Sequence, residues 1–217
     1  MTDDVNGAEA WPRRRARASA TRAKILAAAN ELFLRDGYVS TTMPTIADVA
    51  GVSRATVFNS VGGKADVLRA CYDIAIVGDD TPLPIYARQE MQAMFAEPDP
   101  RVTIARYAAV ITAIGARVSP IYEVFRAAAG ADPQVRVMWA QIQDERHFGA
   151  TRFAEMLTAK SPRPDGVSIN EAADIIWVLI DNSLYHRLVI DRSWSPDRFQ
   201  RWFATTLSAH LLDHQSQ

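Results

Sequence analysis

The chain has 217 residues, a formal net charge of -1 at pH 7 and 48% hydrophobic residues, enough for one or two globular domains with a buried core. Its single cysteine, Cys71, excludes a disulfide framework and a multi-cysteine metal site, and the N-terminus contains nothing like the apolar segment of a signal peptide. The longest apolar run, Ile175–Ile180, is far shorter than the roughly 20 residues that cross a bilayer. The sequence therefore predicts a cytoplasmic protein without a membrane span.

Basic residues are concentrated near the N-terminus. Between Trp11 and Lys64 there are nine Lys or Arg and three Asp or Glu, a net charge of +6, whereas the chain after Lys64 carries -4. A compact basic segment joined to a mildly acidic body is typical of a polyanion-binding unit attached to a unit with a different partner.

The basic segment opens with WPRRRAR, Trp11 to Arg17. Repulsion among its four arginines predicts a flexible arm over residues 1–18, either a solvated tail or an arm that lies along a nucleic-acid backbone or enters its minor groove. The arginines of this arm are Arg13, Arg14, Arg15 and Arg17.

Helical periodicity begins after the arm, and no segment has the alternation of a strand. A first helix is expected from Ser19 to Asp36, ended by Gly37. A second, short helix follows Thr41 and Thr42, either of which can cap it, and it ends at Gly51. Because glycine adopts positive φ at little cost, the chain can turn sharply at Gly51.

Ser53 can cap a third helix directly after this turn, which completes a helix-turn-helix. The exposed N-terminal half of the third helix is where a recognition helix meets base edges and phosphates. An ordinary helical hairpin is the alternative, and the adjacent basic segment favours DNA binding. The residues expected on this exposed surface are Arg54, Ala55, Thr56, Phe58 and Asn59.

From Ala20 to Leu68 the sequence resembles the TetR (tetracycline repressor) family of bacterial transcription regulators. The shared pattern includes Phe33 before Gly37-Tyr38, the Thr41-Thr42 pair, Ala50-Gly51-Val52-Ser53, and Lys64 followed by Leu68. The resemblance implies an all-α protein with a helix-turn-helix domain over 19–68 and a helical effector-binding and dimerisation domain over 69–217. It also implies a homodimer on a palindromic operator, most often a repressor. No motif for a cofactor appears in the sequence, and we predict none.

The resemblance assigns a phosphate-binding role to Lys64, for which a surface charge at a helix start is the alternative. Phe58 stands where the family usually has a tyrosine, so its ring can pack on a sugar or a thymine methyl but cannot donate to phosphate. Arg54 can bind guanine O6 and N7 bidentately. Besides the arm and the residues above, the predicted DNA-binding set contains Thr42, Ser53 and Ser60.

The remainder of the chain is predicted to be helical, with breaks at Val77–Pro84 and Ser161–Gly166. Helices are expected over 85–97, 100–118, 120–129 and 133–159, and then over Ile169–Asp191 and Pro196–Asp213. In the TetR family the last two helices pair with their copies in a second subunit, and the alternative is an intramolecular core face. The predicted dimer interface is Ile175, Leu179, Ser183, His186, Phe199, Trp202, Phe203, Leu207 and His210.

The central helices are rich in aromatic residues with a few polar ones between them, which favours a pocket for a small apolar effector. An ordinary core is the alternative, since aromatic residues at helical spacing pack cores more often than they line pockets. The predicted pocket residues are Tyr107, Ile111, Tyr122, Phe125, Trp139, Gln143, His147, Phe148, Trp177 and Asn182.

Two other function classes are open, an enzyme built on a helical bundle and a DNA-binding architectural protein without an effector. His210 and His214 have the spacing of metal ligands on a helix, as Asp144 and His147 do, but no third ligand accompanies either pair. Histidines in a last helical turn are more often explained by the helix dipole. We therefore predict neither a metal site nor an enzyme.

Overall fold

The computed structural model describes residues 6–78 and 88–212, with side chains from residue 15 onward, and the described part is all-α. This confirms the predicted fold class. The helices are α1 (Asn6–Ser40), α2 (Met43–Ala50), α3 (Arg54–Ser60), α4 (Lys64–Val77), α5 (Gln89–Ala96), α6 (Pro100–Ala131), α7 (Pro133–Lys160), α8 (Ile169–Leu179), α9 (Asn182–Tyr185), the π-helix η2 (His186–Asp191) and α10 (Pro196–Leu211).

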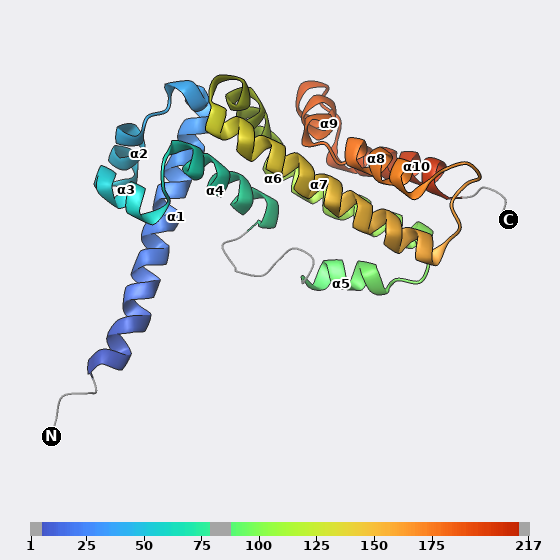
Figure 1. Ribbon diagram of the computed structural model, residues 1–217, viewed down its shortest axis with the longest axis horizontal. Coiled ribbons are helices and arrows are strands. Elements are labelled where there is room, and N and C mark those ends of the chain that lie inside the picture. The colour runs from blue at the N-terminus through green and yellow to red at the C-terminus, as the bar shows by residue number, and fades with distance from the viewer. Residues whose placement is uncertain (1–5, 79–87, 213–217) are drawn as a thin grey trace.

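The helices form two parts joined by α4 (Figure 1). We call α1–α3 the head and α5–α10 the body. In the body, the long helices α6 and α7 run side by side, α8 and α10 pack at the end far from the head, and α4 lies between the head and α6.

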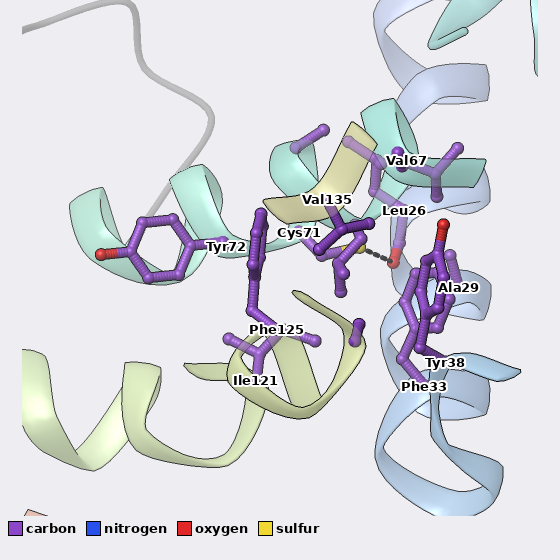
Figure 2. Close-up of a cluster of buried hydrophobic side chains, with 14 of the residues drawn as sticks. Leu26, Ala29, Phe33, Tyr38, Val67, Cys71, Tyr72, Ile121, Phe125 and Val135 are labelled. Carbon is purple, nitrogen blue, oxygen red and sulfur yellow. Dashed lines mark hydrogen bonds between the residues drawn. The ribbon is translucent and has the colours of Figure 1, made fainter. Parts of the chain in front are cut away.

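One hydrophobic core is shared by the head, α4 and the head-proximal end of the body (Figure 2). Leu26 and Phe33 from α1 pack in the same cluster as Val67 from α4 and Phe125 from α6. All four side chains are at most 3% exposed. The position of the head is therefore set by apolar packing against the body as well as by the chain connection.

A second core fills the far end of the body. Tyr107 stacks on Phe153 with ring centroids 3.7 Å apart, and Phe203 packs near Tyr107 at 6.0 Å. Phe199, Phe203 and Leu207 are at most 1% exposed in the single chain. These three residues, which the sequence predicts at the dimer interface, pack inside their own chain.

Helix α1 begins at Asn6, so the flexible arm predicted over residues 1–18 is wrong from residue 6 onward. Alanine and arginine are strong helix formers, and each residue other than Pro12 that extends an existing helix gains a hydrogen bond without a new nucleation cost. These gains outweigh the charge repulsion on which the prediction relied. Gly37, with φ 77° and ψ 171°, interrupts the helical backbone where the sequence predicted its end.

Helix α6 continues through Pro120, although the sequence predicted two helices divided there. A proline removes one intrahelical hydrogen bond, and packing on both sides of it, at Val118 and Ile121, holds the helix together. The helix is long and apolar enough by length and composition to cross a membrane. It contacts α1, α4, α7, α9 and α10, which accounts for its apolar side chains by packing within the bundle.

The segment predicted as one helix over Ile169–Asp191 is broken after Leu179. Asp181 ends this break by capping α9, since its Oδ1 accepts from the Ser183 N–H at 2.8 Å. The chain then widens into η2, where the Arg192 N–H donates to the Arg187 carbonyl at 3.1 Å. The side chain of Asp181 thus bonds a backbone N–H and interrupts the helix. The apolar periodicity of the segment gave no sign of this break.

Candidate nucleic-acid interface

The turn between α2 and α3 is built from the capping residues that the sequence indicated. The Thr42 hydroxyl accepts from the Thr45 N–H at 3.2 Å, and the Ser53 hydroxyl accepts from the Thr56 N–H at 3.0 Å. Gly51 has φ 67° and ψ 36°, the left-handed conformation that lets α2 end sharply. Thr42 therefore caps α2 and Ser53 caps α3, each through its side chain.

Helix α3 lies at the outer edge of the head and buries one residue fully (Figure 1). Val57 is fully buried, whereas Arg54, Ala55, Phe58 and Asn59 are exposed, with Phe58 at 63%. Thr56 and Ser60 are half-buried. The structure thus brings the predicted base-reading residues together on one accessible face.

Arg54 makes no hydrogen bond or ion pair within the described residues, so its guanidinium is available for a partner. Arg17 is exposed on α1, and Arg15 is exposed as well but has interactions of its own. The side chains of Arg13 and Arg14 lie outside the described ones. The described arginines of the predicted arm therefore lie on α1, next to the helix-turn-helix.

Lys64 lies at the start of α4 and already has partners in the protein. Its Nζ donates to the Val39 carbonyl at 3.3 Å and lies 4.2 Å from the centre of the Tyr38 ring. Partial burial lowers the pKa of Lys64 from its ordinary value. Lys64 therefore has a structural role in the head, and a contact with phosphate would be a second role of the same side chain.

The head is tied to the body by polar contacts that sequence reasoning missed. The Tyr38 hydroxyl donates to Asp132 Oδ2 at 2.7 Å, and Asp132 caps α7 through its other oxygen. This hydrogen bond lowers the pKa of Asp132. Arg69 of α4 donates to both carboxylate oxygens of Glu145 in α7, at 3.0 and 2.9 Å. Partners so distant in sequence leave no local signal.

Arg117 of α6 holds the C-terminal end of α4. Its Nε donates to the Ala75 carbonyl and its Nη2 to the Ile76 carbonyl, both at 3.2 Å. These are carbonyls of the last helical turn, which lack intrahelical donors and carry partial negative charge. Gly78 has φ 83°, and a Cβ there would lie 3.1 Å from Arg117 Nε, so a glycine allows this close approach.

Cys71 is buried where α4 meets α1, and its thiol donates to the Leu26 carbonyl at 3.6 Å (Figure 2). Burial disfavours the thiolate and raises the pKa of Cys71 from 9.0 to about 12.

We expect Cys71 to resist alkylation by iodoacetamide in the folded protein at pH 8. The raised pKa leaves a thiolate fraction about a thousandfold smaller than that of an ordinary cysteine, and only the thiolate reacts. The rate should rise as the pH approaches 12 or on addition of urea. Mass spectrometry of time points gives the rate, and fast labelling at pH 8 without urea would show that the junction opens readily.

The predicted pocket residues are divided among different parts of the body. Tyr122, Phe125 and Trp139 lie together in the first core, where the Tyr122 and Trp139 ring centroids are 4.8 Å apart. Their own rings fill the space between α6 and α7. Tyr107 lies in the second core, with Ile111 packed against it.

The other predicted pocket residues are also separated. Phe148 is 69% exposed on α7, and the neighbouring His147 Nε2 lies 2.9 Å from Asp174 Oδ1. Asn182 is buried in α9, and the Trp177 Nε1 is buried without a hydrogen-bond partner in the described part. Gln143 donates to the Tyr122 hydroxyl at 3.4 Å. The prediction that these residues line one pocket therefore has no support from the packing.

A polar cluster stands where the α8–α9 break meets α6 and α7. Asp181 Oδ2 accepts from the Tyr122 hydroxyl at 2.8 Å and lies 3.3 Å from Arg146 Nη1. Arg146, whose side chain is 9% exposed, also donates to the Trp177 carbonyl at 3.0 Å. Removing one member of such a pair would leave a buried charge unpaired, so this cluster fixes the bend of the chain at Asp181.

Only His210 of the His210–His214 pair lies within the described part of the chain. His210 Nδ1 lies 2.7 Å from the Thr206 carbonyl on α10, and His214 lies outside the described residues. Among residues 6–78 and 88–212, no group of three or more His, Cys, Asp or Glu could hold a metal ion.

An exposed recognition helix on a capped turn, flanked by a basic helix, defines a helix-turn-helix DNA-binding protein. Comparison with known proteins agrees with this class. Residues 25–71 match the model of the bacterial regulatory proteins, tetR family. The N-terminal part of the chain is therefore similar to TetR-family regulators, and this match supports a DNA-binding helix-turn-helix and a role in transcription regulation.

Solved structures share the fold over nearly the whole chain. A protein described as a TetR-family transcriptional regulator from Syntrophomonas wolfei has a TM-score of 0.69 and 18% identity, covering 88% of this chain and 94% of its own. NalD, the secondary repressor of the MexAB-OprM multidrug efflux pump in Pseudomonas aeruginosa, has a TM-score of 0.69 and 19% identity, covering 92% and 100%. A transcriptional regulator from Saccharomonospora viridis, solved in complex with choline, has a TM-score of 0.66 and 17% identity, covering 90% and 100%. A search of the curated proteins found no match.

Proposed function

We propose that the protein is a homodimeric, ligand-responsive cytoplasmic repressor that binds a palindromic operator through α3 of each subunit. The observation that carries this proposal is the exposed face of α3 on a head whose orientation is fixed by contacts with the body. Arg54, Phe58 and Asn59 supply the accessible surface, and Tyr38 and Arg69 supply contacts to α7. A change in the body can therefore move the recognition helix.

Two similar structures support the finer parts of the proposal. NalD is a repressor, and the Saccharomonospora viridis protein binds choline. A ligand shifts a conformational equilibrium only by its differential affinity for two states, so a release of about a hundredfold needs about 3 kcal/mol of preference.

The experiment is a shift assay of the full-length protein on genomic fragments, followed by footprinting of the retained fragment. We expect a palindromic footprint with half-sites one helical turn, about 34 to 36 Å, or a multiple of it apart. Uniform binding to all fragments, with no footprint, would favour an architectural DNA-binding protein. No retention at any salt concentration below 100 mM would refute DNA binding itself.

The second subunit is proposed to cover the α7–α8 face of the body. Phe148 and Val178 are 69% and 55% exposed, which is costly for large apolar side chains in water. They lie in one region, because Phe148 follows His147, which contacts Asp174, and Val178 stands one turn after Asp174. The predicted interface residues Ile175 and Leu179 are half-buried on the same helix and Ser183 lies just beyond it.

The dimer prediction is tested with Phe148→Glu and Val178→Glu. Each substitution places a carboxylate in a central apolar contact, so dimer dissociation should increase by roughly 30-fold or more. Light scattering against concentration measures the change. Val102→Glu, at another exposed apolar residue on α6, is the matched control and should leave the dimer intact. Unchanged dimers in both test variants would place the interface elsewhere, with His186, Trp202 and His210 as the remaining predicted residues.

A further inference from the structure

A groove lies between the head, α4 and the body, and we call it the junction groove. It has a volume of about 380 Å³, within the range of small-molecule sites. Its walls come from three elements, with Leu26 and Leu34 on α1, Ile74 on α4, and Ile121 on α6. An occupant would touch both the DNA-binding part and the effector part of the chain.

The groove is mostly apolar and partly open to solvent. Leu34, in the wall from α1, is 44% exposed, and the exposed Ala23 and Ala27 continue the same wall toward the N-terminus. Binding of an apolar molecule would bury this strip, and removing apolar surface from water lowers the free energy.

The charge of the lining residues favours an anionic ligand. Arg117 is the only charged residue among its described lining residues, and none of them is acidic. Two of the guanidinium's nitrogens bond the α4 carbonyls, whereas Nη1 makes no hydrogen bond within the described residues. The Asn30 amide also lines the groove without a hydrogen bond in the described part of the chain. The groove therefore offers donors for an anionic group.

We propose that the junction groove binds a small amphipathic anion, an apolar molecule with one carboxylate or sulfonate. Its apolar part lies against Ala27, Leu34 and Ile74, and its anionic group bonds the Arg117 guanidinium. That this occupant is the effector rests on the function proposed above. An anion at Arg117 Nη1 shares the guanidinium charge with the carbonyls of Ala75 and Ile76 and so weakens the hold of α6 on α4.

The test titrates the full-length protein with 1-anilinonaphthalene-8-sulfonate, which fluoresces in apolar sites. N-phenyl-1-naphthylamine, the same ring system without the sulfonate, is the uncharged probe. Ala27→Trp fills the groove from an exposed position and should weaken sulfonate binding by about tenfold or more. Ala159→Trp, at an exposed position on α7 outside the groove, is the matched control and should change it by less than about twofold. Ala23→Trp replaces Ala27→Trp if circular dichroism shows that the first variant is unfolded.

Arg117→Gln tests the charge. It should weaken binding of the sulfonate by about tenfold and leave the uncharged probe unchanged, because only the sulfonate makes the charge-assisted hydrogen bond. Unchanged sulfonate binding in a folded Ala27→Trp variant would overturn the proposal. Equal weakening of both probes by Arg117→Gln would overturn the anionic part, since the substitution would then act through the shape of the groove.

Operator binding by the same preparations separates this proposal from the proposed function. Bound sulfonate probe should weaken operator binding, and operator should weaken the probe by the same factor. Probe binding in the groove without any DNA retention would refute the regulator and leave the site standing. DNA retention with a probe that binds outside the groove would refute the site alone.

Discussion

Replacing Phe203 by alanine is expected to lower the free energy of unfolding by about 3 to 5 kcal/mol, the cost of emptying a closed aromatic site. Phe203 is fully buried between Tyr107 and Phe199, with ring centroids 6.0 and 6.3 Å away. Urea denaturation followed by far-ultraviolet circular dichroism gives the value.

Thr205→Ala, at an exposed position on the same helix, is the control and should change stability by less than about 0.5 kcal/mol. If Phe203→Ala instead kept its stability and lost only dimerisation, α10 would be an interface helix and its packing in the single chain would be misassigned. For the same reason, removing α10 is expected to unfold the far end of the body instead of yielding a folded monomer.

Arg54→Ala is expected to weaken binding to the selected operator by about 1 to 3 kcal/mol and binding to random DNA much less. The reason is that Arg54 is exposed at the start of α3 and has no partner within the described residues, so its guanidinium can bind a guanine edge. Fluorescence anisotropy on both DNAs at several salt concentrations provides the measurement.

The matched control is Arg35→Ala, because Arg35 is exposed on the same head but its guanidinium is held by Asp36 at 2.8 Å. Equal losses on operator and random DNA for Arg54→Ala would assign this arginine to phosphate contact. Lys64→Ala is a weaker probe of phosphate binding than the sequence indicated, since it also removes the contacts with Val39 and Tyr38.

The helix-turn-helix could be predicted because its signals are local. Thr42, Gly51 and Ser53 each act on neighbouring backbone, so their positions indicated the caps and the turn without knowledge of the rest of the chain. The exposed residues of α3 followed from the helical period once these ends were known. The sequence match to the bacterial tetR-family regulators, over residues 25–71, covers the same region.

The body could be predicted only as a series of helices. An amphipathic pattern shows that one face of a helix is buried but not by what, so Phe199 and Leu207 fitted a partner subunit as well as their own core. The break at Asp181 and the continuity of α6 at Pro120 depend on tertiary contacts, which override local propensity. The aromatic residues show the same limit. Tyr107 and Tyr122 both fit the buried face of a helix by their spacing, yet they pack in different cores.

The core shared by Leu26, Val67 and Phe125 limits how this protein can be recombined with its relatives. The border predicted from the sequence, at residue 68, falls inside α4, and apolar packing continues across it from α1 to α6. A chimera that joins this head to another regulator's body would expose half of a core on each side of the seam. Exchange of operator specificity should therefore succeed by transplanting the surface residues of α3, and fail by transplanting residues 1–68 as a block.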